Sequence, residues 1–194
     1  VALLLAAPWL LGTYYLGELT AVLIWSLAGL GLMLISGHTG QVSLGHAAFM
    51  AIGAFTNLAL MMRGWHFIPA LLASAVTSGV LGAIISRPIL RMSGIYLAIA
   101  TLALSIIIED VSIIAEPITG GVAGLFAPPI DMFGLKIDRY TSPAAFYYLC
   151  LTVLVIVTLG YLNLLRSASG RSFLAVRDSE VSARALGVNV ARAK

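Results

Sequence analysis

Long apolar segments separated by short polar connectors form the dominant pattern of this chain. Six charge-poor segments stand out, at residues 2–16, 19–36, 42–62, 67–86, 92–108 and 141–165. A helix needs about 20 mostly apolar residues to cross the hydrocarbon core of a bilayer. The pattern therefore predicts an all-α fold, a polytopic transmembrane helix bundle of about six spans.

One apolar stretch is too long for a single span. Residues 19–62 contain no Asp, Glu, Lys or Arg, and glycines interrupt the run from Ser36 to Phe49. An unbroken helix over this stretch would be about 66 Å long, roughly twice the hydrocarbon thickness. We therefore expect a broken helix near residues 36–43. Irregular backbone at membrane depth persists only inside protein or along a polar cavity, so this segment is a candidate transport path.

Polar side chains follow the predicted break. Gln41, Ser43 and His46 can hydrogen-bond a polar solute, and half-helix ends at a break can face substrate charges. We assign the substrate pathway to Gln41, Ser43, Gly45 and His46. Polar side chains in spans also join helices to one another, and the sequence leaves both roles open. His38 and His46 have no carboxylate in this span to complete a site, so we expect no metal there.

Composition places the chain in the membrane. It is 60% hydrophobic and 10% charged, with a mean hydropathy of +1.03, whereas soluble domains carry about 25% charged residues. The net charge of +3 comes mostly from basic residues that flank apolar segments, which indicates membrane topology and not nucleic-acid binding. The single cysteine, Cys150, lies in an apolar run and is expected to pack. The chain begins at Val1 without a signal peptide pattern, and we expect a fragment.

Charges in the connectors predict the orientation. Basic residues outnumber acidic ones after the last span: Arg166, Arg171, Arg177, Arg184, Arg192 and Lys194 against Asp178 and Glu180. Since Lys and Arg accumulate in cytoplasmic loops, the tail is predicted to be cytoplasmic. The connector 87–91 then lies on the same side, and the acidic connector 109–140 is external. Glu109 and Asp110 are expected to end a span at the interface, and the glycines and prolines of 119–129 indicate a loop.

Small residues recur at helical spacing in two spans. Residues 67–86 carry Ala70, Ser74, Ser78, Gly82 and Ser86, with Ala75, Gly79 and Ala83 on the neighbouring row. Residues 42–62 carry Ser43, Ala47, Ala51 and Ala54. Such stripes allow close helix packing in lipid. They predict a central position for 67–86 and a packing role for both stripes.

The tail contains a short helix with signals at both ends. Asp178 or Ser179 can cap its N-terminus, Glu180 suits its first turn, and Gly187 suits the left-handed position after its end. The sequence therefore predicts about two turns of helix between residues 179 and 186. Such a helix either presents a compact contact to a cytoplasmic partner or lies at the membrane interface.

Four stretches together resemble the membrane permease subunit of branched-chain amino acid ABC importers, the LivM type. They are GHTGQVSLGHAAF at 37–49, RMSGIYLAIATLAL at 91–104, TGGVAG at 119–124 and SGRSFLAVRDSEVSARALGVN at 169–189. They occur in the order of that family and extend over nearly the whole chain. The resemblance implies that residues 1–194 are a single transmembrane permease domain with a cytoplasmic coupling loop at about 166–194.

The resemblance also implies partners and a location. The chain would pair with a second permease subunit, as a heterodimer, in the bacterial cytoplasmic (inner) membrane. Two ATPase subunits would bind ATP, and a periplasmic or lipid-anchored protein would supply the solute. No cofactor is implied for this chain, and it contains no phosphate-binding GxxxxGK[ST] loop.

The tail helix resembles the coupling helix of such importers, whose pattern is Glu-Ala-Ala, three residues, then Gly. Counted back from Gly187, the pattern falls on residues 181–183, so only Ala183 and Gly187 match strictly and Glu180 lies one place early. The resemblance assigns ATPase coupling to Arg177, Glu180, Ala183 and Gly187.

These expectations define a function and its alternatives. The resemblance implies a non-enzymatic permease that moves branched-chain amino acids inward, with energy from separate ATPase subunits. A permease for urea or short-chain amides, a channel, and an intramembrane enzyme with His38 or His46 as a base remain alternatives. An enzyme would need a nucleophile or metal ligands beside the histidine, and the sequence offers no convincing set.

Overall fold

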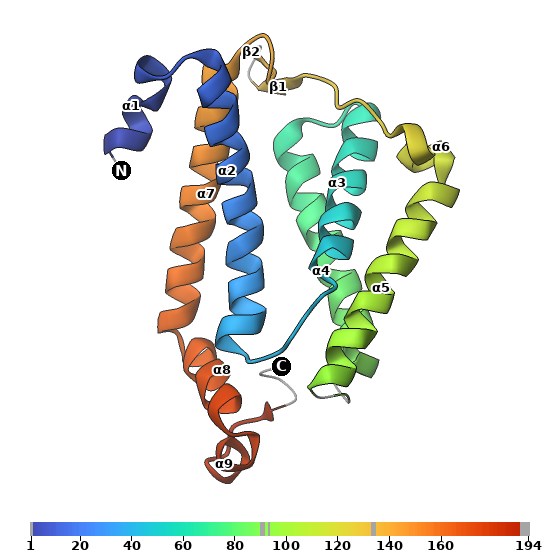
Figure 1. Cartoon of the computed structure of the whole chain (residues 1–194), viewed down its shortest axis with the longest axis vertical. Helices are drawn as coiled ribbons and strands as arrows, with labels where there is room; N and C mark the ends of the chain where they lie inside the picture. Colours follow the sequence, from blue (N-terminus) through green and yellow to red (C-terminus); the bar gives the residue numbers. More distant parts are fainter. Residues whose placement is uncertain (1, 90–91, 93, 133–134, 191–194) are drawn as a thin grey trace. The chain divides into compact units, whose positions relative to one another are not determined.

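The computed structural model describes residues 2–89, 92, 94–132 and 135–190, and it confirms an all-α polytopic bundle (Figure 1). The elements in order are α1 (Ala2–Leu10), α2 (Thr13–Leu32), the π-helix η1 (Met33–His38), α3 (His46–Met62), α4 (Phe67–Ile89), α5 (Ile95–Ile114), α6 (Glu116–Thr119), the 3-10 turn η2 (Gly121–Ala123), β1 (Ile130–Met132), β2 (Leu135–Ile137), α7 (Pro143–Arg166), α8 (Ala168–Asp178) and α9 (Glu180–Ala185). The antiparallel pair β1–β2, which joins Ile130 to Ile137, was not predicted.

Four helical segments of the described chain are long and apolar enough to cross a bilayer. They are Thr13–His38, Phe67–Ile85, Ile95–Ile114 and Pro143–Arg166, and at most 17% of each apolar window is buried. Large side chains such as Trp25, 69% exposed, and Ile156, 63% exposed, project from them. Such surfaces fit contact with lipid. The apolar helix α3 has 17 residues and is about 26 Å long, just short of the hydrocarbon thickness.

The chain divides into two compact units, and each is built from segments distant in sequence. Unit 1 comprises residues 1–33 and 129–171, and unit 2 comprises residues 34–128 and 172–194. In unit 1, α2 packs along α7 and the two helices run in the same direction (Figure 1). Leu16 and Leu23 of α2 form the core of this unit with Tyr147, Cys150 and Leu151 of α7. The expected packing role of Cys150 is confirmed.

The first predicted span, 2–16, is two helices and not one. α1 ends at Leu10 and α2 begins at Thr13, so residues 14–16 belong to the next span. With nine residues, α1 is about 14 Å long and does not cross the hydrocarbon core. The sequence interpretation was wrong here because an apolar run shorter than a span was counted as one.

Pro8 leaves an unpaired carbonyl inside α1, and α7 supplies the missing donor. A proline within a helix lacks the N–H that would bond the carbonyl four residues earlier, here that of Leu4. The Tyr147 hydroxyl donates to the Leu4 carbonyl at 2.8 Å, and the Tyr148 hydroxyl donates to the Leu5 carbonyl at 2.8 Å. Tyr147 is fully buried. Two adjacent tyrosines thus fasten the proline-containing helix to α7.

The parallel direction of α2 and α7 constrains the topology. Two spans run in the same direction only when an odd number of crossings lies between them. The segments between α2 and α7 include α3, α4 and α5, so three crossings satisfy this condition if α3 also spans. A crossing by α7 alone puts the loop before it and the tail on opposite sides, as the connector charges predict.

The first row of small residues on α4 packs against α3 in unit 2. Ala70 is fully buried, and the Ser78 hydroxyl donates to the Phe49 carbonyl at 3.4 Å. A Cβ on Gly82 would meet the Phe49 ring at 3.5 Å. This row therefore has the predicted packing role, whereas Ala75, Gly79 and Ala83 on the neighbouring row are exposed. The side chain of Ser86 is outside the described residues.

Several boundaries differ from the predicted ones. α5 continues to Ile114, so Glu109 and Asp110 are exposed residues within its last turns and do not end it. On α3 the buried small residue is Ala48 and not Ala47, and Ser43 precedes the helix. The connector 87–91 begins inside α4, and its residues 90 and 91 are outside the described residues. The helix α8 was not predicted.

The Tyr147 hydroxyl is expected to contribute most to the free energy of unfolding when residue 8 is a proline. Tyr147→Phe removes the donor to the Leu4 carbonyl and should lower the free energy of unfolding by about 1 kcal/mol, as for hydrogen bonds in membrane helices. In a Pro8→Ala background the backbone supplies the missing N–H, and the cost should shrink. Denaturation in detergent measures both. Tyr140→Phe, at an 85% exposed residue, is the control, and an equal cost in both backgrounds would contradict this account.

The topology is testable by labelling cysteines in intact cells, after replacement of Cys150 by alanine. A membrane-impermeant reagent should modify a cysteine at Ala123, which is exposed in the loop before α7. It should not modify one at Ser172 in α8 until the cells are permeabilised. Equal labelling of both positions in intact cells would overturn the predicted orientation.

Candidate functional site

The predicted helix break is present, and it begins with a π-helical turn. Regular α-helix ends at Leu32, η1 continues to His38, and residues 39–45 are irregular. The Thr39 amide donates to the Leu34 carbonyl, and the Gln41 amide donates to the Ile35 carbonyl, each at 3.2 Å. These five- and six-residue steps are wider than the α-helical step. Such bulges occur often at functional sites.

The irregular segment is anchored on α5 before α3 begins. The Leu44 amide donates to Thr101 Oγ1 at 2.9 Å, and Ser105 Oγ is 3.4 Å from the Leu44 carbonyl. Gly45 is buried, and a Cβ there would lie 2.7 Å from the Thr101 carbonyl oxygen. Gly45 is therefore a position of close backbone approach between the start of α3 and α5.

The tail helix α9 has the two predicted end signals. Ser179 caps it, because its hydroxyl accepts from the Ser182 amide at 3.2 Å. At the other end Gly187 has a φ of +80°, its amide donates to the Arg184 carbonyl, and the Val188 amide donates to the Ala183 carbonyl. These two bonds form a Schellman motif. Of the two predicted capping residues, Ser179 is the one used.

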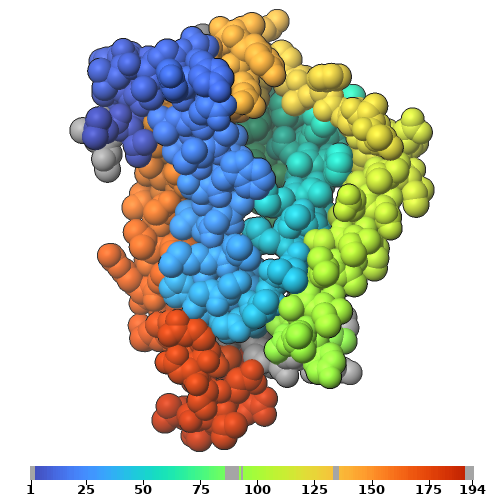
Figure 2. All heavy atoms as spheres, in the orientation of Figure 1, coloured from blue at the N-terminus to red at the C-terminus, as the bar shows by residue number. Residues whose placement is uncertain are grey.

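The tail has a small core and an exposed apolar side. Val176, Ala183 and Val190 are buried together, and Phe173 and Val188 pack against them. Val181 and Leu186 of the same segment are 80% and 81% exposed. Figure 2 shows the atoms of this tail, in red, as a compact lobe. The tail is thus stabilised by its own small core, and Val181 and Leu186 remain exposed on its surface.

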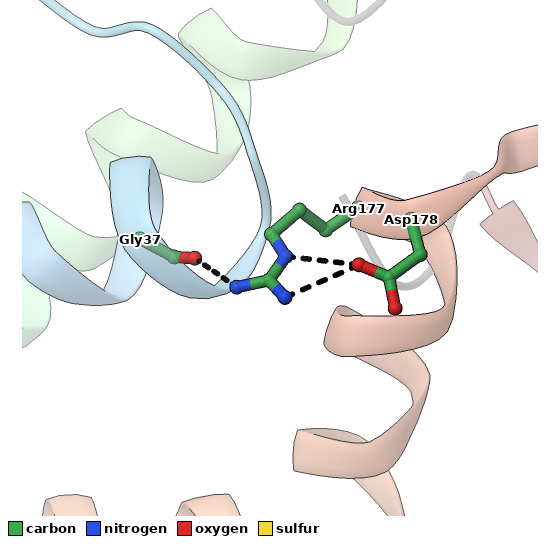
Figure 3. A network of polar contacts seen from close by, with 3 residues as sticks. All are labelled: Gly37, Arg177 and Asp178. Carbon is green, nitrogen blue, oxygen red and sulfur yellow. Dashed lines mark hydrogen bonds and ion pairs between the residues drawn. The ribbon is translucent and has the colours of Figure 1, made fainter.

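Arg177 joins the tail to the helix break. Its Nη1 donates to the Gly37 carbonyl at 3.0 Å, and its Nε and Nη2 donate to Asp178 Oδ1 at 3.2 and 3.1 Å (Figure 3). The aliphatic part of the side chain lies against Gly40, where a Cβ would be 2.8 Å from Arg177 Cγ. Both contacts lie within unit 2.

A cavity of about 320 Å³ opens beside this contact. Its lining comprises residues 39–42 of the break, Met92 and Gly94 before α5, Leu97 in the first turn of α5, and residues 176–180 of the tail. Gln41, one of the lining residues, has a buried amide nitrogen, Nε2, for which the described residues provide no hydrogen-bond partner. A buried unpaired donor carries a desolvation cost that a hydrogen-bond acceptor would relieve.

The predicted site residues therefore have different surroundings. Gln41, Arg177 and Glu180 line the cavity, whereas Ser43 and His46 are half-buried and do not. Gly45 packs on α5, Ala183 lies 1% exposed in the tail core, and Gly187 ends α9. His38 and His46 belong to no cluster of three potential metal ligands among the described residues.

Two residues of this region were not singled out from the sequence. Thr101 accepts from the Leu44 amide and donates to the Ala98 carbonyl, each at 2.9 Å. The sequence did not indicate this role, because a threonine in an apolar helix usually bonds only to its own backbone. Asn57 of α3 has a buried amide nitrogen without a hydrogen-bond partner in the part of the chain that the structure describes. The sequence could have indicated Asn57, because an amide within an apolar helix needs a hydrogen-bond partner and such residues are few in membrane spans.

Comparison with known proteins gives one family. Residues 14–194 match the family described as "Branched-chain amino acid transport system / permease component". No solved structure matches the chain.

Two curated relatives carry the description "High-affinity branched-chain amino acid transport system permease protein LivM". The chain is 33% identical to that of Salmonella typhimurium over 90% of its own length and 46% of the relative. It is 32% identical to that of Escherichia coli over 100% of its own length and 52% of the relative. The chain thus spans about half the length of these relatives.

The close approach at Gly45 should not tolerate a methyl group. Gly45→Ala places a Cβ against the backbone of Thr101, and one of the two helices must shift. We expect a loss of about 1–3 kcal/mol of stability, the usual cost of overpacking. Gly29→Ala in α2, where a Cβ meets nothing within 4 Å, is the matched control and should be neutral or stabilising. Thermal denaturation in detergent compares them, and equal midpoints would refute the assigned contact.

Proposed function

Because the chain belongs to the family of permease components of branched-chain amino acid transport systems, we propose that it forms part of a subunit that imports branched-chain amino acids. Both units belong to one permease domain in the bacterial inner membrane. A second permease subunit completes the pathway as a heterodimer. Two ATPase subunits hydrolyse ATP, and a separate solute-binding protein delivers the amino acid, so this chain itself is not an enzyme.

The tail is the observation that supports this proposal most directly. It follows the last span, carries Arg166, Arg171 and Arg177, and is folded around its own small core. Val181 and Leu186 nevertheless remain about four-fifths exposed. These two exposed apolar side chains, on an otherwise charged segment, are available for a protein contact. A surface of this kind fits a groove on a cytoplasmic ATPase.

The four residues assigned to coupling then have different roles. Ala183 supports α9 from inside the tail, and Gly187 ends the helix, which accounts for the two strict matches to the importer pattern. Glu180 lies in the first turn, where Arg184 is 4.0 Å away. The contact with the ATPase itself is made by the exposed side chains of Val181 and Leu186. Arg177 is directed toward the break.

The substrate pathway is proposed to pass the break, beside Gln41. The Nε2 donor of Gln41, which has no partner among the described residues, is suited to a carboxylate or carbonyl oxygen of an amino acid. Ser43 follows on the same irregular segment, His46 is the first residue of α3, and Gly45 fixes the end of the segment against α5. The proposal thus keeps all four predicted pathway residues. Among them, Gly45 acts by packing against α5 and not by contact with the solute.

Reconstitution of the full-length protein with its neighbouring subunits tests this function. Co-purification of an ATPase and ATP-dependent uptake of leucine, isoleucine or valine are the expected results. Uptake of urea or short amides in their place would favour the alternative substrate class. Uptake without ATP and without a bound ATPase would identify a channel and overturn the proposal.

Gly187→Val separates coupling from general stability. Valine is strongly disfavoured at positive φ, so the Schellman motif should lose about 1–2 kcal/mol locally. We expect normal membrane insertion but loss of transport and of substrate-stimulated ATP hydrolysis. The matched control is Gly64→Val, because Gly64 has a φ of +85° and ends α3 through the same pair of bonds, with the Met61 and Leu60 carbonyls. If both variants retain wild-type coupling, or lose it equally, the tail has no special part in coupling.

A further inference from the structure

The end of the broken helix depends on a donor from the tail. A helix leaves its last carbonyl groups without partners inside the helix. η1 ends at His38, and the Gly37 carbonyl near this end accepts from Arg177 at 3.0 Å. A cation at a helix C-terminus also interacts favourably with the helix dipole. Arg177 therefore acts as a C-terminal cap that is contributed from 140 residues away.

Gly40 makes room for this arginine. Its φ of +68° lies in the left-handed region that favours glycine, and its missing side chain leaves space for the Arg177 stem. A Cβ at this position would lie 2.8 Å from Arg177 Cγ. The fit is therefore steric as well as polar, and the two contacts involve different parts of one side chain.

Asp178 fixes the direction of the guanidinium. Its Oδ1 accepts from both Nε and Nη2, which leaves Nη1 directed to the Gly37 carbonyl (Figure 3). Asp178 is 69% exposed, so the ion pair itself contributes little stability. Its effect is to orient Arg177.

We propose that Arg177 is the positioning residue through which displacement of α9 acts on the helix break. The proposal rests on the function given above, in which α9 docks on an ATPase. Arg177 is separated from α9 only by Asp178 and Ser179, so a shift of α9 either breaks the bond to Gly37 or carries the break with it. Arg177 is thus an internal link and not a contact to the ATPase.

The link leads to the candidate pathway. The break that Arg177 holds contains Gln41, and the Leu44 amide at its far end is bonded to Thr101. The segment between these two attachments is short and lines the cavity with the tail. Movement of the tail therefore changes the surroundings of Gln41 before it reaches α3.

The test uses the full-length importer reconstituted with its ATPase. Arg177→Ala removes both the donor and the stem that lies against Gly40. We expect the ATPase to co-purify and to hydrolyse ATP, while uptake falls about tenfold, as for the loss of a hydrogen bond from a charged donor. The number of ATP molecules hydrolysed per solute should rise, a change that a purely structural role would not cause. Arg171→Gln, which removes a charge from the same helix, should leave this ratio unchanged.

Gly40→Ala tests the same contact from the other side. It should uncouple the importer in the wild-type background through collision with Arg177 Cγ, and add little in the Arg177→Ala background. Gly64→Ala has the same backbone constraint in open space and controls for strain alone. Arg177→Lys keeps the charge and one donor, so partial coupling is expected if Arg177→Ala does not accumulate in the membrane.

The outcomes distinguish this proposal from the proposed function. Loss of ATPase co-purification on Arg177→Ala would show that Arg177 contacts the ATPase and would overturn the internal link. A wild-type ratio of ATP to solute in Arg177→Ala would also overturn it, while the importer itself remained established. If the wild-type protein neither binds an ATPase nor imports amino acids, the proposed function is overturned, and the role of Arg177 in coupling is overturned with it.

Discussion

Backbone groups in a bilayer have no water to bond, so each interruption of a helix must find a partner within the protein. At Pro8 the freed Leu4 carbonyl accepts from Tyr147. Past the break, the Leu44 amide donates to Thr101. At the end of η1, beside the tail, the exposed Gly37 carbonyl also accepts from a distant side chain, that of Arg177. In each case a side chain distant in sequence replaces the missing helical bond, and these replacements determine which segments lie together.

Hydroxyl groups within the spans follow the same constraint locally. Thr20, Thr56 and Ser112 each donate to the carbonyl four residues earlier, at 2.6–2.7 Å. Such side chains place their hydroxyl hydrogen bond within their own helix and leave the helix surface apolar. The amides of Gln41 and Asn57 are different, since each keeps a buried nitrogen that no described residue pairs with. This contrast is why Gln41 is central to the proposed pathway.

The sequence predicted what length and local chemistry determine. The break follows from a charge-free stretch that exceeds one bilayer, and the ends of α9 follow from Ser179 and Gly187. The contacts of Tyr147, Thr101 and Arg177 were not predicted, because each joins residues at least 57 positions apart and hydropathy carries no information on such pairs. The extra span at 2–16 arose because α1 and the start of α2 are both apolar, although Gly12 separates them.

The discontinuity of unit 1 has a consequence for biosynthesis. α2 leaves the ribosome before α7, with 110 residues between the end of one and the start of the other. At usual rates of translation this delay is on the order of ten seconds. During that time α2 resides in the membrane without its partner, and Leu16 and Leu23 face lipid or other helices. The hydroxyl of Thr20, bonded to its own helix, exposes no unpaired donor in this interval, which makes early insertion of α2 compatible with late assembly.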